Sequence, residues 1–260
     1  MPELPDVEGF RRVLAEHAGE PIAGVAVLDA GVLRGVTART LRDALRGHRF
    51  EEPRRHGKWL IAPAGGPVLL LHFGMTGSLT WHDAAEPRHR HDRVVWRLPG
   101  GELRYRDMRK LQGVHLDDAG EVLGDLGPDA LEVSRRDLAG LLSHRRGRLK
   151  PTLTDQTVIA GLGNLLADEI CWRARVNPLR TASDLDAAEV AALHRALRRV
   201  LRDSVEAERV PPRRTWLTGA RDRPDPACPR CGTPLCSRRV SGRRTVWCPA
   251  CQPARGELGR

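Results

Sequence analysis

The first residues of the chain carry apolar side chains at the spacing of an amphipathic helix. Between Pro5 and Ala18 they recur every three or four positions, at Val7, Phe10, Val13, Leu14 and Ala18. The start of this segment is acidic, with Glu3, Asp6 and Glu8, and its middle is basic, with Arg11 and Arg12, which suits the dipole of a helix. The pattern therefore predicts a helix over residues 5–18 that buries one face.

The pattern changes to short apolar runs between Ile22 and Leu116. The runs are VAVL, KWLIA, VLLLHF, VVWRL and ELRYR, and glycine, proline and aspartate separate them. Short apolar runs bounded by such residues are typical of strands. We expect a β-rich domain here, interrupted by one helix at about Thr40–Arg46.

Helical spacing returns after the segment LGPDALEVS (126–134). We expect one helix at Asp137–His144 and a second, short one within Leu149–Val158. The stretch AGLGN then makes a tight turn, and LLADEICWRARV continues as a helix beginning at Asn164.

The longest helix is expected over Asp186–Glu208, before VPPRR breaks it. Ser183 and Asp186 resemble a capping box at its start. Its predicted inner face consists of Val190, Leu193, Leu197, Val200, Leu201 and Ser204.

Charge and composition restrict the partners. The chain has 260 residues and a formal net charge of +10. Such a surplus favours a polyanionic partner such as nucleic acid, and a merely solvated arginine-rich surface is the alternative that composition leaves open. Lysine occurs only at Lys58, Lys110 and Lys150, so each of these positions calls for a reason.

No apolar run approaches the roughly 20 residues of a membrane span, and the start lacks the pattern of a signal peptide. We therefore expect a cytoplasmic protein with no membrane partner, and a monomer, since there is no heptad repeat. Cysteines in that compartment do not favour disulfides.

Four of the six cysteines form two CxxC pairs near the end of the chain. Cys228 and Cys231 precede Cys248 and Cys251, with 16 residues between the pairs. Two such pairs complete a tetrahedral zinc site, and four thiolates leave no open position for catalysis. We expect one structural Zn²⁺ on a hairpin that turns at 241–242. Its tip is crowded with basic residues, Arg238, Arg239, Arg243 and Arg244. Cys171 and Cys236 are interpreted as ordinary thiols.

Several motifs together resemble one family. The chain begins MPELPDVE, carries GLGN at 161–164 and ends in the four-cysteine finger. Further matches are PRRHGKWL (53–60), LHFGMTGSL (71–79), YRDMRK (105–110) and LGPDAL (126–131). In this order they resemble the bacterial formamidopyrimidine-DNA glycosylases, which share a fold with endonuclease VIII.

The resemblance implies an α+β fold of two domains. An N-terminal two-layer β-sandwich with flanking helices would be followed by a helix-two-turn-helix domain bearing a β-hairpin zinc finger. We expect the catalytic domain at 1–130, the helix-two-turn-helix domain at 131–223 and the finger at 224–260. The implied partner is double-stranded DNA with a damaged base or an abasic site.

The resemblance also implies catalytic residues. After removal of Met1, Pro2 would present a secondary amine that attacks C1′ of the damaged nucleotide. The resulting iminium ion cannot lose an N–H proton, so it acts as an electron sink for strand cleavage by elimination. Glu3 would move protons and assist opening of the sugar ring. Asp6 stands where the family more often has glutamate. Lys58 would assist catalysis and touch the phosphate next to the lesion.

Further residues would contact DNA. Asn164, at the start of a helix, and Arg244, on the finger, would bind phosphates, and Lys150 matches a lysine of the family near the same groove. A plain helix cap is the alternative for Asn164, and Arg243 is a possible substitute for Arg244. Glu169 matches a glutamate that the family places near the nucleophile.

A glycosylase must also fill the gap left by the extruded nucleotide. Met75 matches the void-filling methionine, and Arg109 the arginine that reads the base opposite. Leu111 occupies the place of a usual phenylalanine.

Two departures leave the lesion open. The segment at 209–227 is shorter than the loop that closes over 8-oxoguanine in the family, and Thr157 replaces a usual lysine. Ring-opened purines, 8-oxoguanine, oxidised pyrimidines and abasic sites all remain candidates. The predicted function is a base-excision-repair glycosylase with lyase activity, and the alternative is a non-catalytic protein that binds damaged DNA.

Overall fold

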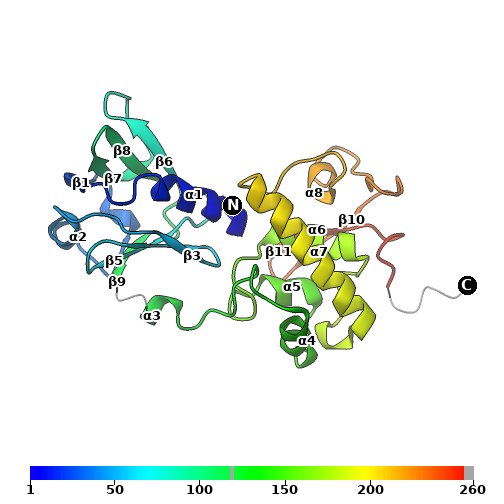
Figure 1. The fold of residues 1–260 in the computed structure, drawn as a ribbon. Helices are drawn as coiled ribbons and strands as arrows, with labels where there is room; N and C mark the ends of the chain where they lie inside the picture. Colours follow the sequence, from blue (N-terminus) through cyan, green and yellow to red (C-terminus); the bar gives the residue numbers. More distant parts are fainter. Residues whose placement is uncertain (118–119, 255–260) are drawn as a thin grey trace, which may run out of the picture. The chain divides into compact units, whose positions relative to one another are not determined.

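A computed structural model describes residues 1–117 and 120–254, and it divides into two compact units, residues 1–125 and 126–260. Figure 1 shows the elements of each unit. Within the described part of the chain, no helix is both long and apolar enough to cross a membrane.

The first unit is a β-sandwich with helices beside it. Its elements in chain order are α1 (Leu4–Ala15), β1 (Gly24–Val27), β2 (Leu33–Arg34), α2 (Ala38–Leu45), β3 (Arg54–His56), β4 (Trp59–Pro63), β5 (Val68–His72), β6 (Ser78–Asp83), β7 (Asp92–Leu98), β8 (Gly101–Arg106), β9 (Val114–Asp117) and α3 (Gly120–Leu123). One sheet has the order β1-β7-β8-β6 and the other β2-β9-β5-β4-β3. The strand pairs are antiparallel except for β2 and β9.

The core of this unit joins the two sheets and α1. Leu60 and Leu71 from one sheet, Val94 and Leu103 from the other, and Val7 from α1 belong to one buried cluster. The β-rich prediction and the two-layer sandwich are therefore confirmed. Burying such side chains is the main favourable term in folding.

Helix α1 begins one residue before the predicted start and ends three residues before the predicted end. Pro5 sits in its first turn, where the missing N–H costs nothing because that group has no partner inside a helix. Val7 and Leu14 are buried, and Phe10 and Val13 pack partly buried against the core. The predicted apolar face is confirmed.

The second unit consists of helices followed by a two-stranded hairpin. Its elements are α4 (Arg135–Ser143), α5 (Leu149–Thr154), α6 (Asn164–Ala174), α7 (Ala187–Glu206), α8 (Leu217–Ala220), β10 (Cys236–Val240) and β11 (Arg243–Trp247). The predicted inner face of α7 is buried throughout. The hairpin turns at Ser241 and Gly242, both with positive φ, as a two-residue turn requires.

One sequence prediction in this unit is confirmed and another is wrong. The short helix expected within 149–158 is α5, which ends at Thr154 because the Asp155 side chain accepts the N–H and the hydroxyl of Thr157 and turns the chain. The capping box of α7 pairs Asp186 with Glu189, whereas Ser183 lies in a short 3₁₀ turn before it. The sequence Asp-x-x-Glu provides the same exchange of hydrogen bonds one turn later.

Candidate functional site

The amino terminus is held at the start of α1. Glu3 is the N-cap of the helix, and its side chain is buried. Its backbone N–H donates to Oδ2 of Asp6 at 2.8 Å. The shorter carboxylate at position 6 is therefore long enough to fix the backbone next to Pro2, which is half-buried.

Helix α1 is tied to the turn that carries Lys58. Arg55 Nε lies 3.4 Å from Oε2 of Glu8, in α1, and Arg55 Nη1 donates to the Gly57 carbonyl at 2.9 Å. Gly57 has a φ of 58°, which favours glycine, and Lys58 follows it as a buried residue between β3 and β4. One arginine thus links the helix of Glu3 to the turn of Lys58.

His72 is a further residue of this region that the sequence did not single out. It ends β5, and its ring packs edge-on to Trp59 with the ring centroids 4.8 Å apart. Its Nδ1 accepts the N–H of Gly74 at 3.0 Å. Burial, the Lys58 charge and His115 lower the pKa of His72 to about 4. The ring is therefore neutral at neutral pH and can accept that hydrogen bond.

The structure brings Met75 and Arg109 into contact. Arg109 Nη1 lies 2.9 Å from the sulfur of Met75. Met75 and Leu111 are 41% and 51% exposed, although both are apolar. Met108, on the same segment as Leu111, is also exposed, and the resemblance had assigned it no role. We call Met75, Arg109 and Leu111 the wedge.

Asn164 is the first residue of α6, as predicted. Gly163, the N-cap, has no side chain with which to close the helix, and the Oδ1 of Asn164 is buried without a hydrogen-bond partner in the described residues. The turn before it is braced by Gln156, which donates to the Leu162 carbonyl at 3.0 Å and accepts from Gly161 N–H at 3.0 Å. A braced helix start with its positive dipole end suits an anion.

Lys150 occupies a different environment from the one expected. Its side chain is 2% exposed, with Nζ 2.6 Å from Oδ1 of Asp168 and 2.6 Å from the Arg244 carbonyl, to which it donates. Arg221 also pairs with Asp168. Burial lowers the pKa of Lys150 and raises that of Asp168, against the attraction between them. The ammonium thus anchors the backbone of Arg244, and the arrangement does not favour direct contact with a phosphate.

The guanidinium of Arg244 projects from β11 and is held by surface groups. Nη1 donates to Oδ1 of Asp222 at 2.6 Å, and Nη2 to the Arg221 carbonyl at 3.0 Å. Arg243 is exposed beside the hairpin turn. The backbone of the basic tip is therefore held by Lys150 through the Arg244 carbonyl.

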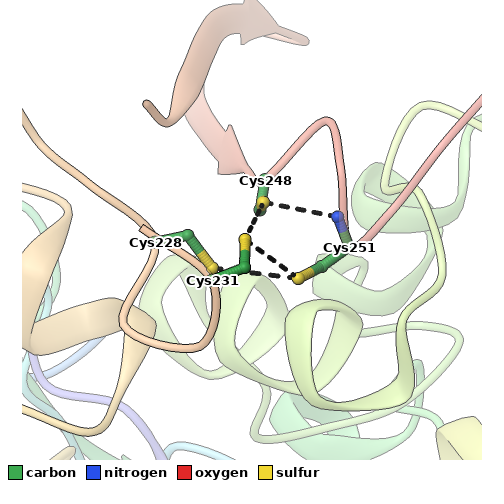
Figure 2. Close-up of side chains that lie close together, drawn as sticks. All are labelled: Cys228, Cys231, Cys248 and Cys251. Carbon is green, nitrogen blue, oxygen red and sulfur yellow. Dashed lines mark hydrogen bonds between the residues drawn. The ribbon is translucent and has the colours of Figure 1, made fainter. Parts of the chain in front are cut away.

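The four predicted cysteines come together as one cluster (Figure 2). Their sulfur atoms lie within 4.8 Å of one another. Cys231 Sγ is 3.6 Å from Cys248 and 3.5 Å from Cys251, and Cys228 Sγ is 3.9 Å from Cys251. A tetrahedral ion with metal–sulfur bonds of about 2.3 Å separates its ligands by roughly 3.8 Å, so the cluster fits a metal ion.

This cluster packs on α6. Trp172 donates from its indole nitrogen to Cys228 Sγ at 3.3 Å and shares a buried cluster with Leu217, Val246 and Cys248. Cys171 and Cys236 are outside the metal cluster, as predicted. The finger is thus attached to the helices of its unit by apolar contacts and by hydrogen bonds of its backbone, from Lys150 to the Arg244 carbonyl and from the Val246 N–H to Asp168. The three-part domain division stays a prediction.

Comparison with known proteins identifies the family. The model of the formamidopyrimidine-DNA glycosylase N-terminal domain matches residues 1–114, and that of its H2TH domain matches 126–212. Formamidopyrimidine-DNA glycosylases of Pelotomaculum thermopropionicum and Symbiobacterium thermophilum are 36% and 38% identical over 97% of the chain and 99% and 90% of theirs. The chain belongs to the formamidopyrimidine-DNA glycosylase family. It is a DNA glycosylase of base excision repair.

A solved structure agrees over the same length. The Lactococcus lactis glycosylase, in complex with DNA that contains an abasic site, has a TM-score of 0.88 and 26% identity, with 97% of this chain and 100% of that one covered. Pro2, Glu3, Lys58 and the wedge all lie in the first matched range. The cysteines lie beyond both ranges, and the metal site is inferred from the geometry of the cluster.

The segment at 209–227, expected to be too short to close over a lesion in the way of the family, is anchored to its own unit at Trp216 and α8, with exposed stretches at 212–215 and 222–225. Trp216 is buried, and the N–H of Thr218 in α8 donates to Oε2 of Glu169 at 3.1 Å. Glu169 also pairs with Arg173 at 2.8 Å, and burial raises its pKa. Glu169 therefore holds α8 on α6, and its predicted place near the nucleophile stays a prediction.

Proposed function

We propose that this glycosylase also cleaves the DNA strand, and that Pro2 is its nucleophile once Met1 has been removed. The secondary amine attacks C1′, the N–C1′ bond forms, and the bond from C1′ to the base breaks as the base takes up a proton. The amine nitrogen loses its own proton, the C1′–O4′ bond breaks as O4′ takes up a proton, and the nitrogen lone pair forms the iminium ion at C1′. The iminium ion then draws electrons from the C2′–H bond, and the 3′ C–O bond breaks by β-elimination. A second, δ-elimination releases the 5′ phosphate.

One observation supports this proposal most strongly. A buried carboxylate, Glu3, directly follows Pro2, and Asp6 fixes the backbone between them at the start of α1. A buried carboxyl group next to the reacting amine is suited to proton transfer. Lys58 lies in the turn that Arg55 ties to α1, and its ammonium supplies a cation for the phosphate next to the lesion.

We further propose that duplex DNA with a damaged base or an abasic site is the substrate. Asn164 and Arg244 would bind its phosphates, the wedge would fill the gap, and Lys150 would position Arg244 from below. Zn²⁺ is the metal that four cysteine thiolates favour, as a structural ion. Since 209–227 is short, we propose that it does not cover the extruded base in the way of the family.

Borohydride trapping tests the nucleophile. Protein whose mass confirms removal of Met1 is incubated with abasic DNA and reductant, and we expect a covalent complex. Replacement of Pro2 by glycine together with Glu3→Gln removes it. The matched control is Pro5→Ala, which changes a proline three positions away and leaves the terminus intact. No adduct from the processed protein, or an undiminished adduct from the double variant, contradicts the proposal.

An extra residue in front of Pro2 separates chemistry from binding. It converts the amine into an amide, so trapping is lost while binding to the same DNA persists. If processed protein binds the DNA but forms no adduct, the result favours the alternative, a non-catalytic protein that binds damaged DNA. A panel of lesions opposite each base then defines the substrate.

A further inference from the structure

Lys110 is the one lysine of the chain without a role in the proposed function. It has a φ of 53°, in the left-handed region that non-glycine residues rarely adopt. Its carbonyl accepts a hydrogen bond from Arg34 Nη2 at 2.7 Å, and its Nζ lies 3.1 Å from Oδ2 of Asp29. Both partners are about 80 residues away in the sequence. An unusual backbone conformation next to the wedge is thus held by two distant side chains.

Asp29 joins the two ends of the segment that carries Arg109. Its Oδ2 also accepts from Arg93 Nη1 at 3.0 Å, and Arg93 Nε donates to the Asp107 carbonyl at 2.7 Å. Oδ1 of Asp29 accepts the N–H of Gly31 at 2.9 Å. The Gly31 hydrogen bond and then Lys110 lower the pKa of Asp29, so the carboxylate is charged at neutral pH. The Asp107 carbonyl thus accepts from Arg93 and the Lys110 carbonyl from Arg34, and Asp29 binds both Arg93 and the Lys110 ammonium.

The backbone brings these groups together where β2 meets β9. Leu33 pairs with Val114, and a Cβ on Gly113 would lie 1.8 Å from the Val32 carbonyl oxygen. No side chain fits at position 113. This close approach places Arg34 next to Lys110, and it depends on glycine having no Cβ.

The other half of the wedge is fixed to the same segment. Oδ1 of Asp107 accepts from the Thr76 hydroxyl at 2.6 Å and from the N–H of Arg109 at 3.0 Å. Thr76 follows Met75 in a tight turn closed by the Gly77 N–H, which donates to the Phe73 carbonyl at 2.7 Å. Met75 and Arg109 therefore stand on two turns that share one aspartate.

We propose that Asp29 and Arg34 are positioning residues. They hold the left-handed backbone at Lys110, between Arg109 and Leu111, so that the wedge is set in place before DNA binds. This inference rests on the proposed function of the wedge. A gap in a base stack has a fixed height, and a side chain must enter it when the nucleotide leaves. Contacts that order the segment during folding remove that ordering cost from the binding step.

Two substrates separate positioning from chemistry. The variants are Arg34→Ala and Asp29→Asn, and the matched controls are Arg39→Ala and Asp43→Asn, an exposed ion pair on α2 with 91% and 72% of the side chains accessible. In duplex DNA the wedge has a gap to fill; in a single strand with an abasic site it has none. We expect turnover on the duplex to fall about tenfold or more, as small misplacements do, and trapping on the single strand to be unchanged.

The base opposite the lesion provides the decisive readout. Loosening of Arg109 brings the rates opposite the four bases closer together, whereas loss of a phosphate contact by Arg34 lowers them all by one factor. Uniform loss, unchanged duplex turnover, or equal loss on both substrates overturns the proposal. Failure of the unmodified protein to trap even single-stranded abasic DNA contradicts the proposed nucleophile instead.

A pair of substitutions at Lys110 tests the backbone itself. Asparagine tolerates the left-handed region and valine does not, and both remove the ammonium. We therefore expect Lys110→Asn to keep more of the opposite-base preference than Lys110→Val. Equal preference in the two variants, with both folded by circular dichroism, overturns the role of the left-handed turn.

Discussion

The wedge and the tip of the finger present their functional side chains in different ways. The wedge is supported by half-buried groups, since Lys110 and Asp29 are 38% and 25% exposed. The finger arginine is supported by charges with no access to water, since Lys150 and Asp168 are 2% and 0% exposed. In one region solvent can replace a lost partner, and in the other it cannot.

That difference sets how each region responds to change. Removing one member of a buried ion pair leaves an uncompensated charge and costs about 3–5 kcal/mol, whereas an exposed pair is worth about 0–1 kcal/mol. The finger also depends on its cysteine cluster, which shares a buried core with Trp172 and Leu217 of the helices. We therefore expect the finger to fail as a whole, by unfolding, when one of its supporting groups is lost. Loss of one supporting group in the wedge should only make the position of its side chains less exact.

Loss of the metal produces the largest expected effect. A structural zinc ion contributes on the order of 10 kcal/mol to the segment that binds it. Chelation or Cys248→Ser should unfold the hairpin, abolish binding of the duplex and leave the β-sandwich folded. Hydrogen exchange resolves the two regions, and metal analysis should give one zinc ion per chain in the unmodified protein.

Cys236→Ser is the matched control, because Cys236 lies on the same hairpin outside the cluster. It should keep the metal and the binding. Equal loss from Cys236→Ser, or a hairpin that stays protected after complete removal of the metal, contradicts the idea that the finger fails as a whole.

Acid is expected to loosen the wedge through His72. The folded pKa is about 4 against an ordinary value of 6.5, so the unfolded chain binds the proton more readily in this window. Stability is therefore fully present above pH 6.5 and is lost as the pH falls towards 4, by about 2 kcal/mol at pH 5. Urea unfolding of the first unit at pH 7 and pH 5 measures this loss.

His72→Asn isolates the contribution, since an amide oxygen can still accept the Gly74 N–H but does not titrate in this range. Its loss of stability between the two pH values should be smaller by about that amount. His144→Asn, at an exposed position, is the control and should behave like the unmodified protein. If His72→Asn loses as much stability between pH 7 and pH 5 as the unmodified protein, His72 does not cause the acid sensitivity.

The sequence was most informative where one local pattern determines the structure. The two CxxC pairs predicted the cluster, and the apolar spacing of 187–206 predicted the buried face of α7, because each depends on residues within a few turns. The family resemblance added the order of the motifs, and with it the two-layer sandwich that strand patterns alone do not specify.

Partners far apart in the sequence could not be predicted in the same way. Lys150 was expected near phosphate because it matches a lysine of the family. Nothing in its own segment indicates that Asp168 and the Arg244 carbonyl surround it. Lys110 likewise depends on Asp29 and Arg34, across a strand pair that Leu33 and Val114 form. In each case the deciding contact comes from tertiary packing, and a lysine that looks available on sequence is already engaged.

The smallest effect is expected at Asp222, where the finger is most like the wedge. Asp222 and Arg244 form an exposed pair at 2.6 Å, with 63% and 45% of the side chains accessible. A phosphate that binds Arg244 must displace this carboxylate. Asp222→Asn should therefore tighten binding of the duplex, by about two- to fivefold at low salt, in line with the worth of an exposed pair.

Fluorescence anisotropy at two salt concentrations measures this change, and screening should reduce it at the higher one. Asp225→Asn is the control, because it removes the same charge three residues away. If Asp222→Asn instead weakens binding while Asp225→Asn does not, Asp222 orients Arg244 rather than competing with phosphate. The finger would then resemble the wedge, in which an acidic group holds the segment that carries a functional arginine.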